Sequence, residues 1–315
     1  MALTHDSSRK KSIVSFLSIC SIFVAANLIA SSLSHIDDTD ETYGYYEPLH
    51  YLLHGIGMQT WEYSPSHAIR TYAFLTPFWL LGSAIKLLDS SKVNMFYGIR
   101  TALGIFTALS ESYFLVAIYE YYGKNIGDLT LVFTLFSSGI LYCSTALLPS
   151  AVIMSLVMIA TASWMRGRYL STILIGCISV LWSGWPFIGI IYVPFGLQML
   201  CHTFFNSRIE SNKKNDNSKA SGILEGFIRM FTLIFQGAVI LVVVGGSAAA
   251  VDFFMYNRRY HKMFIFIEFT ASNLSLNRIH IIMISMCDFF AFYKFKMQNV
   301  PYMEHSFVQC HRRQW

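Results

Sequence analysis

The stretch IVSFLSICSIFVAANLIASSL, residues 13–33, contains no charged side chain and decides the class of this fold. As a helix rising about 1.5 Å per residue, it is long enough to cross a hydrocarbon core of roughly 30 Å. The stretch therefore predicts a membrane-spanning helix. A cleaved signal peptide is the alternative, because small residues end the run, but the apolar part of a signal peptide is usually only about 7 to 15 residues long.

Other apolar runs follow along the chain, at residues 72–88, 97–117, 129–148, 150–165, 169–200 and 227–251. The whole chain is 54% hydrophobic and only 13% charged, whereas soluble domains are about 25% charged. These features predict an all-α membrane protein, a multi-pass bundle of transmembrane helices. The run 169–200 is too long for one straight span and contains Gly184, Trp185 and Pro186, so it must tilt, kink or break there.

Basic residues set the expected orientation. Arg9, Lys10 and Lys11 precede the first span, which by the positive-inside rule places residues 1–12 in the cytosol and the loop 34–71 on the lumenal side. Counting spans onward returns the Lys-rich linker 202–226 to the cytosol and residues 252–262 to the lumen. The basic link 166–168 falls on the lumenal side in this count, against the rule. Because the basic residues cluster beside spans, the net charge of +5 does not indicate nucleic-acid binding.

The loop 35–70, HIDDTDETYGYYEPLHYLLHGIGMQTWEYSPSHAIR, is the segment most suited to chemistry. Four acids lie within five positions: Asp37, Asp38, Asp40 and Glu41. Such closely spaced carboxylates cannot all ionise easily, so at least one should have a raised pKa. A general base, a divalent-metal site and a solvated acidic turn all remain open from these residues alone.

Aromatic and polar residues follow the acids. The aromatic rings suit sugar stacking or a membrane-interface belt, and on a helix Glu47, His50 and His54 would share one face. That trio could bind a metal, although it matches no fixed metal motif. Glu111, inside the predicted span 97–117, is either a functional acid or an acid that lies at the membrane interface or pairs with Arg100.

Two runs in this loop carry a family resemblance: DTDETYGYYEPLHYL at residues 38–52 and QTWEYSP at residues 59–65. They resemble the first lumenal loop of the GT-C mannosyltransferases that use dolichyl-phosphate mannose, glycosyltransferase family 22, and within it the α-1,2-mannosyltransferases of asparagine-linked glycan assembly. LPS at 148–150, GWPF at 184–187 and AVDFFMY at 250–256 extend the similarity over about residues 12–257. Residues 263–315 look unrelated to the family, so the chain is expected to be its amino-terminal half.

The resemblance implies a reaction and roles for residues. The enzymes transfer mannose, with inversion, from dolichyl-phosphate mannose to a lipid-linked oligosaccharide in the lumen of the endoplasmic reticulum. Asp40 is then the expected base, Glu41 and Asp38 orient it or pair with cations, and Arg70 meets the donor phosphate. The expected sugar and substrate contacts are Glu47, His50, Trp61, Glu62 and Tyr63. No metal, no cofactor and no nucleic acid are expected; the partners are donor, acceptor and membrane lipids.

Other classes of function stay open. The chain could be a catalytically inactive isoform that acts as a membrane binding partner, or a mannosyltransferase of glycosylphosphatidylinositol anchors. A transporter or channel would place charges within several spans, and Glu111 is the clearest such charge in this sequence.

Overall fold

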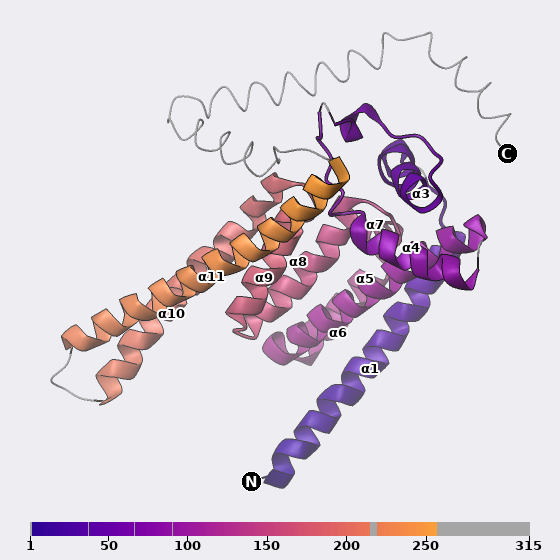
Figure 1. The fold of residues 1–315 in the computed structure, drawn as a ribbon. Helices are drawn as coiled ribbons and strands as arrows, with labels where there is room; N and C mark the ends of the chain where they lie inside the picture. Colours follow the sequence, from indigo (N-terminus) through magenta and orange to yellow (C-terminus); the bar gives the residue numbers. More distant parts are fainter. Residues whose placement is uncertain (1, 37, 66, 90, 215–218, 257–315) are drawn as a thin grey trace, which may run out of the picture. The chain divides into compact units, whose positions relative to one another are not determined.

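The computed structural model describes residues 2–36, 38–65, 67–89, 91–214 and 219–256, all within one compact unit formed by residues 1–261. These residues form helices and turns, with no strand among them, which confirms the predicted all-α fold (Figure 1). In chain order the elements are α1 (Ala2–Leu33), α2 (Thr39–Glu41), η1 (Thr42–Tyr46), α3 (Glu47–His54), η2 (Trp61–Tyr63), α4 (Thr76–Leu88), α5 (Lys92–Tyr122), α6 (Lys124–Leu135), α7 (Ser138–Cys143), α8 (Pro149–Met165), α9 (Tyr169–Leu181), η3 (Pro186–Ile188), α10 (Gly189–Lys214) and α11 (Lys219–Tyr256). Asp37 and the predicted tail 263–315 lie outside the described residues.

Several helices are built to cross a membrane. Among the described residues, four helical segments are long and apolar enough to do so: Phe16–Leu33, Lys92–Tyr122, Pro186–Phe205 and Ile223–Tyr256. The helices α4, α8 and α9 are also apolar but shorter. The chain is therefore a membrane protein.

The first span packs against α5, as Figure 1 shows for the lower part of the view. Between them the Nδ2 of Asn27 donates a hydrogen bond of 3.0 Å to Oε2 of Glu111, and both side chains are buried. An acid inside a span is costly unless it is paired or hydrogen-bonded. Asn27, and not Arg100, is thus the hydrogen-bond partner of Glu111.

Two ion pairs show how α5 runs through the bundle. In the first third of the helix, Arg100 lies 3.7 Å from Glu41 of the acidic loop. Close to its last residue, Glu120 lies 2.8 Å from Arg166, which follows α8. The helix α5 therefore runs from the side of the acidic loop, called the loop side below, to the other end of the bundle.

The apolar run 72–88 does not cross. It forms the short helix α4, and Nζ of Lys86 donates to the carbonyl of Leu53 at 2.7 Å. A helix of this length spans only about 20 Å, and α5 begins on the loop side, so the chain stays there between the two. The run 129–148 is divided into α6 and α7, which together return the chain to Leu147 on the loop side.

The predicted break at Gly184 is confirmed. The helix α9 ends at Leu181, and α10 begins only at Gly189. Gly184 adopts φ +70°, and a Cβ there would lie 2.7 Å from Cγ2 of Thr71, so glycine suits both the backbone and the contact. Because Thr71 ends the loop, the break lies on the loop side. The run 169–200 consequently forms two helices of opposite direction, and α10 then lies beside α11 (Figure 1).

These differences change the expected path of the chain. The run 72–88 was counted as one crossing and makes none, whereas the run 169–200 was counted once and crosses twice. The two differences cancel at Asp252, which is on the loop side as the sequence predicts. They do not cancel at residues 166–168, which lie at the end of the bundle opposite the acidic loop, beside Thr203 of α10 and Arg229 of α11. The basic link is thus no longer an exception to the positive-inside rule.

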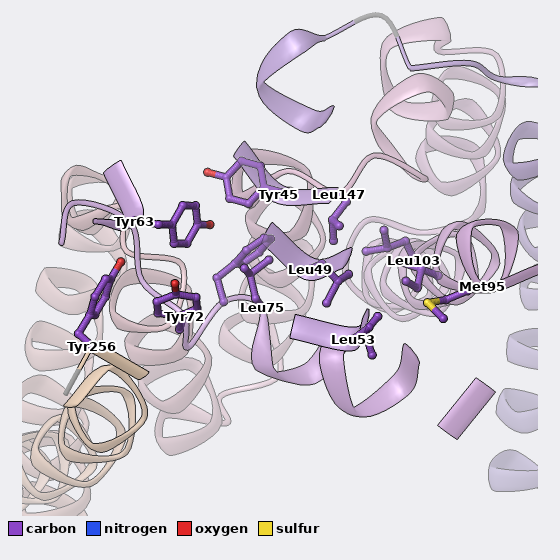
Figure 2. Close-up of a cluster of buried hydrophobic side chains, with 12 residues drawn as sticks. Tyr45, Leu49, Leu53, Tyr63, Tyr72, Leu75, Met95, Leu103, Leu147 and Tyr256 are labelled. Carbon is purple, nitrogen blue, oxygen red and sulfur yellow. The ribbon is translucent and has the colours of Figure 1, made fainter. Parts of the chain in front are cut away.

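A buried cluster joins the loop to the bundle (Figure 2). Residues of the loop, of α5 and of the last turn of α11 meet in it; among them are Tyr45, Leu49, Tyr63, Tyr72, Leu75, Ile99, Leu103, Leu147 and Tyr256. Aromatic side chains bury large areas of apolar surface. The loop is therefore a folded platform fixed on the bundle.

Candidate active site in the acidic loop

The acidic turn starts with a helix cap. Asp38 is the N-cap of α2, and its Oδ1 accepts a hydrogen bond of 2.8 Å from the backbone N–H of Asp40. Aspartate is among the preferred residues at this position, because its side chain satisfies a backbone donor that the helix leaves unpaired. The structure thus places Asp38 in a capping position that orients Asp40.

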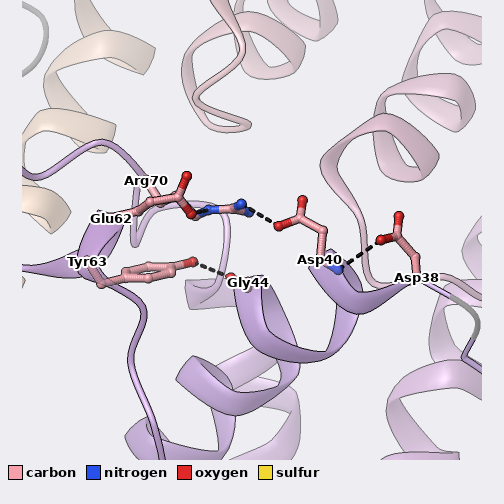
Figure 3. Close-up of polar contacts among 6 residues, drawn as sticks. All are labelled: Asp38, Asp40, Gly44, Glu62, Tyr63 and Arg70. Carbon is pink, nitrogen blue, oxygen red and sulfur yellow. Dashed lines mark hydrogen bonds and ion pairs between the residues drawn. The ribbon is translucent and has the colours of Figure 1, made fainter. Parts of the chain in front are cut away.

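Asp40 belongs to a chain of three charged side chains (Figure 3). Nη2 of Arg70 lies 2.5 Å from Oδ1 of Asp40, and Nε of Arg70 lies 2.5 Å from Oε2 of Glu62. The side chain of Asp40 is 45% exposed, whereas that of Arg70 is 16% exposed. The carboxylate of Asp40 is therefore fixed by a nearly buried cation and still open to a substrate.

The position of Arg70 depends on close packing. A Cβ at Gly44 would lie 2.7 Å from both Nη1 of Arg70 and Oδ1 of Asp40, so only glycine leaves room for this pair. The guanidinium lies over the ring of Tyr45, 4.7 Å from its centroid, and the hydroxyl of Tyr256 donates to the carbonyl of Arg70 at 2.5 Å. Burial lowers the pKa of Arg70, but its acidic surroundings raise this pKa by more, and the side chain stays charged.

Asp252 holds the backbone that follows Arg70. Its Oδ1 accepts hydrogen bonds from Oγ1 of Thr71 at 2.9 Å and from the N–H of Tyr72 at 2.7 Å. Asp252 is only 4% exposed, so a buried carboxylate from α11 fixes the end of the loop. The sequence offered a signal for this role, an aspartate that ends a long apolar run, but no partner for it.

Glu41, next to Asp40, has a different environment. It is 2% exposed, lies 3.7 Å from Nη1 of Arg100, and accepts a hydrogen bond of 2.8 Å from the N–H of Leu147. Burial raises the pKa of the Glu41 carboxyl, against the opposing effects of the Leu147 N–H and of Arg100. The expected raised pKa of a loop acid is thus found at Glu41, whose contacts anchor the loop to the start of α5 and to the residues before α8.

The segment between these two acids and α3 has unusual geometry. Residues Thr42–Tyr46 form a single π-helical turn between α2 and α3. Such turns are rare and occur frequently at functional sites. Here the turn places Gly44 beside Asp40 and Arg70, and directs the carbonyl of Gly44 to the hydroxyl of Tyr63 at 2.9 Å (Figure 3).

Glu47 and His50 shape the turn after α3. Oε2 of Glu47 accepts a hydrogen bond of 3.2 Å from the N–H of Met58, and Nδ1 of His50 donates to the carbonyl of Ile56 at 2.8 Å. The ring of His54 lies 4.6 Å from that of His50, and burial together with His50 lowers the pKa of His54. The predicted shared face of these residues is confirmed. In the part of the chain that the structure describes, no three His, Cys, Asp or Glu side chains form a group that could hold a metal ion.

The two aromatic residues expected at a sugar site, Trp61 and Tyr63, differ sharply in solvent exposure. Trp61 is 60% exposed and packs edge-on against His67, with 5.2 Å between ring centroids. Tyr63 is 1% exposed, and its ring lies within the buried cluster (Figure 2). The structure therefore offers Trp61 to a ligand and uses Tyr63 for packing.

Sequence comparison with known proteins identifies the family of this chain. A sequence model of the Alg9-like mannosyltransferase family matches residues 18–280, which confirms the resemblance and carries it beyond the expected end near residue 257. The Drosophila melanogaster alpha-1,2-mannosyltransferase Alg9 is 42% identical over 56% of this chain and 29% of its own length.

Two fungal relatives extend the comparison. The Schizosaccharomyces pombe alpha-1,2-mannosyltransferase alg9 is 32% identical over 84% of this chain and 42% of its own length. The Saccharomyces cerevisiae alpha-1,2-mannosyltransferase ALG9 is 37% identical over 60% of this chain and 35% of its own length. The chain thus spans less than half the length of each of these relatives, and no solved structure matches it. The acidic loop with its fixed Asp40 and the match over most of the sequence show that the chain belongs to the Alg9-like mannosyltransferase family.

Proposed function

We propose that this chain serves transfer of mannose from dolichyl-phosphate mannose to a lipid-linked oligosaccharide, forming an α-1,2 linkage during assembly of the N-glycan precursor. One observation carries the proposal: the carboxylate of Asp40, half exposed, is held by Arg70 in the loop of a mannosyltransferase family. A general base must be reachable by the hydroxyl from which it takes the proton. Asp40 meets that condition, whereas the neighbouring Glu41 is buried.

The reaction needs a base and a site for a leaving phosphate. The 2-hydroxyl oxygen of the acceptor mannose attacks the anomeric carbon of the donor, and the bond from that carbon to the phosphate oxygen breaks. Asp40 takes the hydroxyl proton, and dolichyl phosphate leaves with the electron pair as an anion. Attack and departure on opposite faces of the sugar invert the anomeric carbon.

Arg70 connects removal of the proton by Asp40 with departure of the phosphate. It contacts Asp40 through Nη2 and Glu62 through Nε, and guanidinium groups bind phosphate by paired hydrogen bonds. When the donor phosphate binds Arg70, the guanidinium turns away from Asp40 and leaves that carboxylate to accept a proton. Glu62, 25% exposed, keeps hold of Arg70 during this exchange.

Other residues support the reacting groups. Asp38 caps the turn that presents Asp40, and the exposed ring of Trp61 stacks on a sugar of the acceptor. Glu47 and His50 contribute by shaping residues 55–58, whose edge borders the acceptor. The buried side chains of Tyr63 and Glu41 hold the loop on the bundle.

We also propose that the protein resides in the endoplasmic reticulum membrane with the acidic loop in the lumen. Arg166, Arg168 and Arg229 lie at the end opposite this loop, and Arg9, Lys10 and Lys11 precede the first span in the sequence. This distribution favours a cytosolic position for that end. No metal is needed, because Arg70 stabilises a single leaving phosphate by hydrogen bonds. Transfer would then continue in EDTA; its loss in EDTA and recovery with Mn²⁺ would show that Asp38 and Asp40 are metal ligands.

The test uses Saccharomyces cerevisiae cells without their own ALG9. Two proteins are compared, this chain alone and this chain joined to the carboxyl-terminal part of the yeast relative, of which it spans 35%. Mass spectrometry of the lipid-linked oligosaccharides should show an additional hexose with the joined protein and none when it carries Asp40→Asn. An unchanged precursor with a joined protein that is present at normal level in the membrane would overturn the proposal.

A further inference from the structure

An open, solvent-facing cavity of about 460 Å³ lies at the end of the bundle opposite the acidic loop. It is lined by the α8–α9 link, the first turn of α9, one residue of α10 and one face of α11. Neither the proposed transfer nor any residue of the acidic loop uses it. Ligand pockets commonly have volumes of about 300 to 1,000 Å³, so a headgroup-sized ligand fits.

The charged side chains of this cavity are basic. Arg168, the N-cap residue of α9, and Arg229 of α11 both line it. The guanidinium of Arg229 also contacts Glu225 at 2.6 Å, but both side chains of that pair are nearly half exposed. Exposed ion pairs are weak, so the pair with Glu225 does not prevent Arg229 from binding an anion in the cavity.

The backbone adds donors to the arginines. Residues Tyr169, Leu170 and Ser171 are the first three of α9, and all three line the cavity. The first N–H groups of a helix have no acceptor within the helix, and the helix dipole favours negative charge there. Gln236 of α11 adds a side-chain amide, whereas the hydroxyls of Thr203 and Thr232 donate to carbonyls of their own helices. The two arginines, Gln236 and the first turn of α9 therefore border one space with several donors, which suits the oxygens of a phosphate group.

The surroundings of the cavity indicate the rest of the ligand. Leu170 and Leu233 line it beside the polar groups. Arg229 lies six positions after the start of the apolar segment Ile223–Tyr256, about 9 Å along the helix. That depth corresponds to the boundary between headgroups and hydrocarbon. A ligand that fills this cavity thus has a phosphate group and an apolar chain beside it.

From this arrangement we infer that the cavity binds the phosphate headgroup of an anionic lipid from the leaflet opposite the acidic loop. Basic pockets between transmembrane helices on the cytosolic side suit such headgroups. Bound there, the lipid joins the start of α9 to α10 and α11 through Arg168 and Arg229. The inference does not depend on mannosyl transfer.

The bland alternative is that Arg168 and Arg229 reach into the headgroup region and attract anionic lipids without a defined site. A defined site needs the shape of the cavity as well as its charge. Gln236→Trp tests shape, because it fills the space and leaves both arginines in place. Arg168→Gln and Arg229→Gln test charge, and Lys124→Gln is the control, since exposed Lys124 follows α5 at the same end of the bundle but does not line the cavity.

The measurement is native mass spectrometry of the purified full chain in detergent with phosphatidic acid, with phosphatidylcholine or with inorganic phosphate. We expect one phosphatidic acid to be retained per chain, with little retention of phosphatidylcholine. Each arginine variant should weaken retention about fivefold, and Gln236→Trp should weaken it by at least as much. Lys124→Gln should leave it unchanged.

Three results would overturn the inference. Retention that falls equally in Lys124→Gln and in the arginine variants, or that survives Gln236→Trp, would show unspecific attraction to basic residues. Displacement of phosphatidic acid by an equal concentration of inorganic phosphate would show that the site takes a soluble phosphate. Should an arginine variant fail to fold, Gln236→Trp and the phosphate competition still decide the outcome, because neither removes a charge.

Discussion

The carboxylate of Asp252 accepts the backbone N–H of Tyr72 at 2.7 Å and so connects the last turns of α11 to the residues that follow Arg70. The two residues are 180 positions apart in the sequence. Because Tyr256 also donates to the carbonyl of Arg70, the backbone on both sides of Thr71 is held by a single helix end. The geometry of the candidate active site therefore depends on a distant part of the chain.

Replacing Asp252 tests this dependence. Asp252→Leu leaves the Thr71 hydroxyl and the Tyr72 N–H without their acceptor, which should lower the free energy of unfolding by about 1–3 kcal/mol. Asp252→Asn keeps an acceptor oxygen and is the matched control, with a smaller loss. Thermal unfolding in detergent measures both. Equal unfolding temperatures for Asp252→Leu and the unchanged protein would show that the hydrogen bonds contribute nothing.

Asp40→Asn separates the proposed base from its neighbour. In the joined protein described above, this change should slow transfer by about 10² to 10⁴ without altering the protein level, because the amide cannot accept the proton. Asp38→Asn is the control, since asparagine also caps helices well. Near-normal transfer by Asp40→Asn would remove Asp40 from the role of base.

Arg70→Lys tests the need for a planar guanidinium. An ammonium cannot contact Asp40 and Glu62 in the geometry of Nη2 and Nε, nor bind a phosphate in fork fashion. We expect kcat/KM for the donor to fall by about tenfold or more, with a raised KM for the donor and a smaller effect on KM for the acceptor. Arg166→Lys is the matched control, because Arg166 also pairs with a carboxylate but lies at the other end of the bundle. A drop of similar size in both variants would contradict the assignment.

Glu41→Gln should alter how stability depends on pH. Burial raises the pKa of Glu41 in the folded protein above its ordinary value of 4.5. Below pH 4.5 the carboxyl is protonated in the folded and unfolded states, so burial of its charge costs nothing. As the pH rises through the window above 4.5, the unfolded state loses the proton first, and the free energy of unfolding falls until the folded pKa is passed.

This contribution is absent in Glu41→Gln. The difference in unfolding temperature between the two proteins, measured from pH 4.5 to 7 in detergent, should therefore change with pH in the direction that favours the variant at higher pH. A difference that stays constant across the range would show that the Glu41 pKa is not raised by folding.

Labelling of an introduced cysteine tests the path of the chain. By the span count from the sequence, Lys124 lies on the loop side, whereas the structure places it beyond the end of α5 that carries Glu120. A membrane-impermeant maleimide should therefore label Lys124→Cys and Trp61→Cys from opposite sides of the membrane. The parent chain sets the background, because Cys201 is exposed. Labelling of both sites from one side would contradict the structure.

The sequence predicts the elements whose character is local. Absence of charge over residues 13–33 suffices for the membrane part of α1, and Gly184 with Pro186 suffices for the break between α9 and α10, since each acts through its own backbone. Length is harder to judge. The run 72–88 is as apolar as a span, and only the packing of α4 beside the loop shows that it does not cross.

Neighbouring residues of the loop show where local patterns fail. Asp40 and Glu41 have similar chemistry, yet one is 45% exposed in its side chain and the other is 2% exposed. Trp61 and Tyr63 are separated in the same way. In each pair the choice is made by partners far away in sequence, such as Arg100, Leu147 and the buried cluster around Tyr72. No pattern within residues 35–70 contains that information.

The hydrogen bonds from Asp252 and Tyr256 of α11 to residues 70–72 also bear on the order in which the nascent chain folds. The acidic loop leaves the ribosome more than 180 residues before Asp252 and Tyr256, the residues that complete its hydrogen bonds. Contacts of such long sequence separation form late, because the entropy cost of closing a large loop comes before the contact can stabilise the fold. In the nascent chain, the backbone on both sides of Thr71 therefore lacks its hydrogen bonds to Asp252 and Tyr256 until α11 has been made.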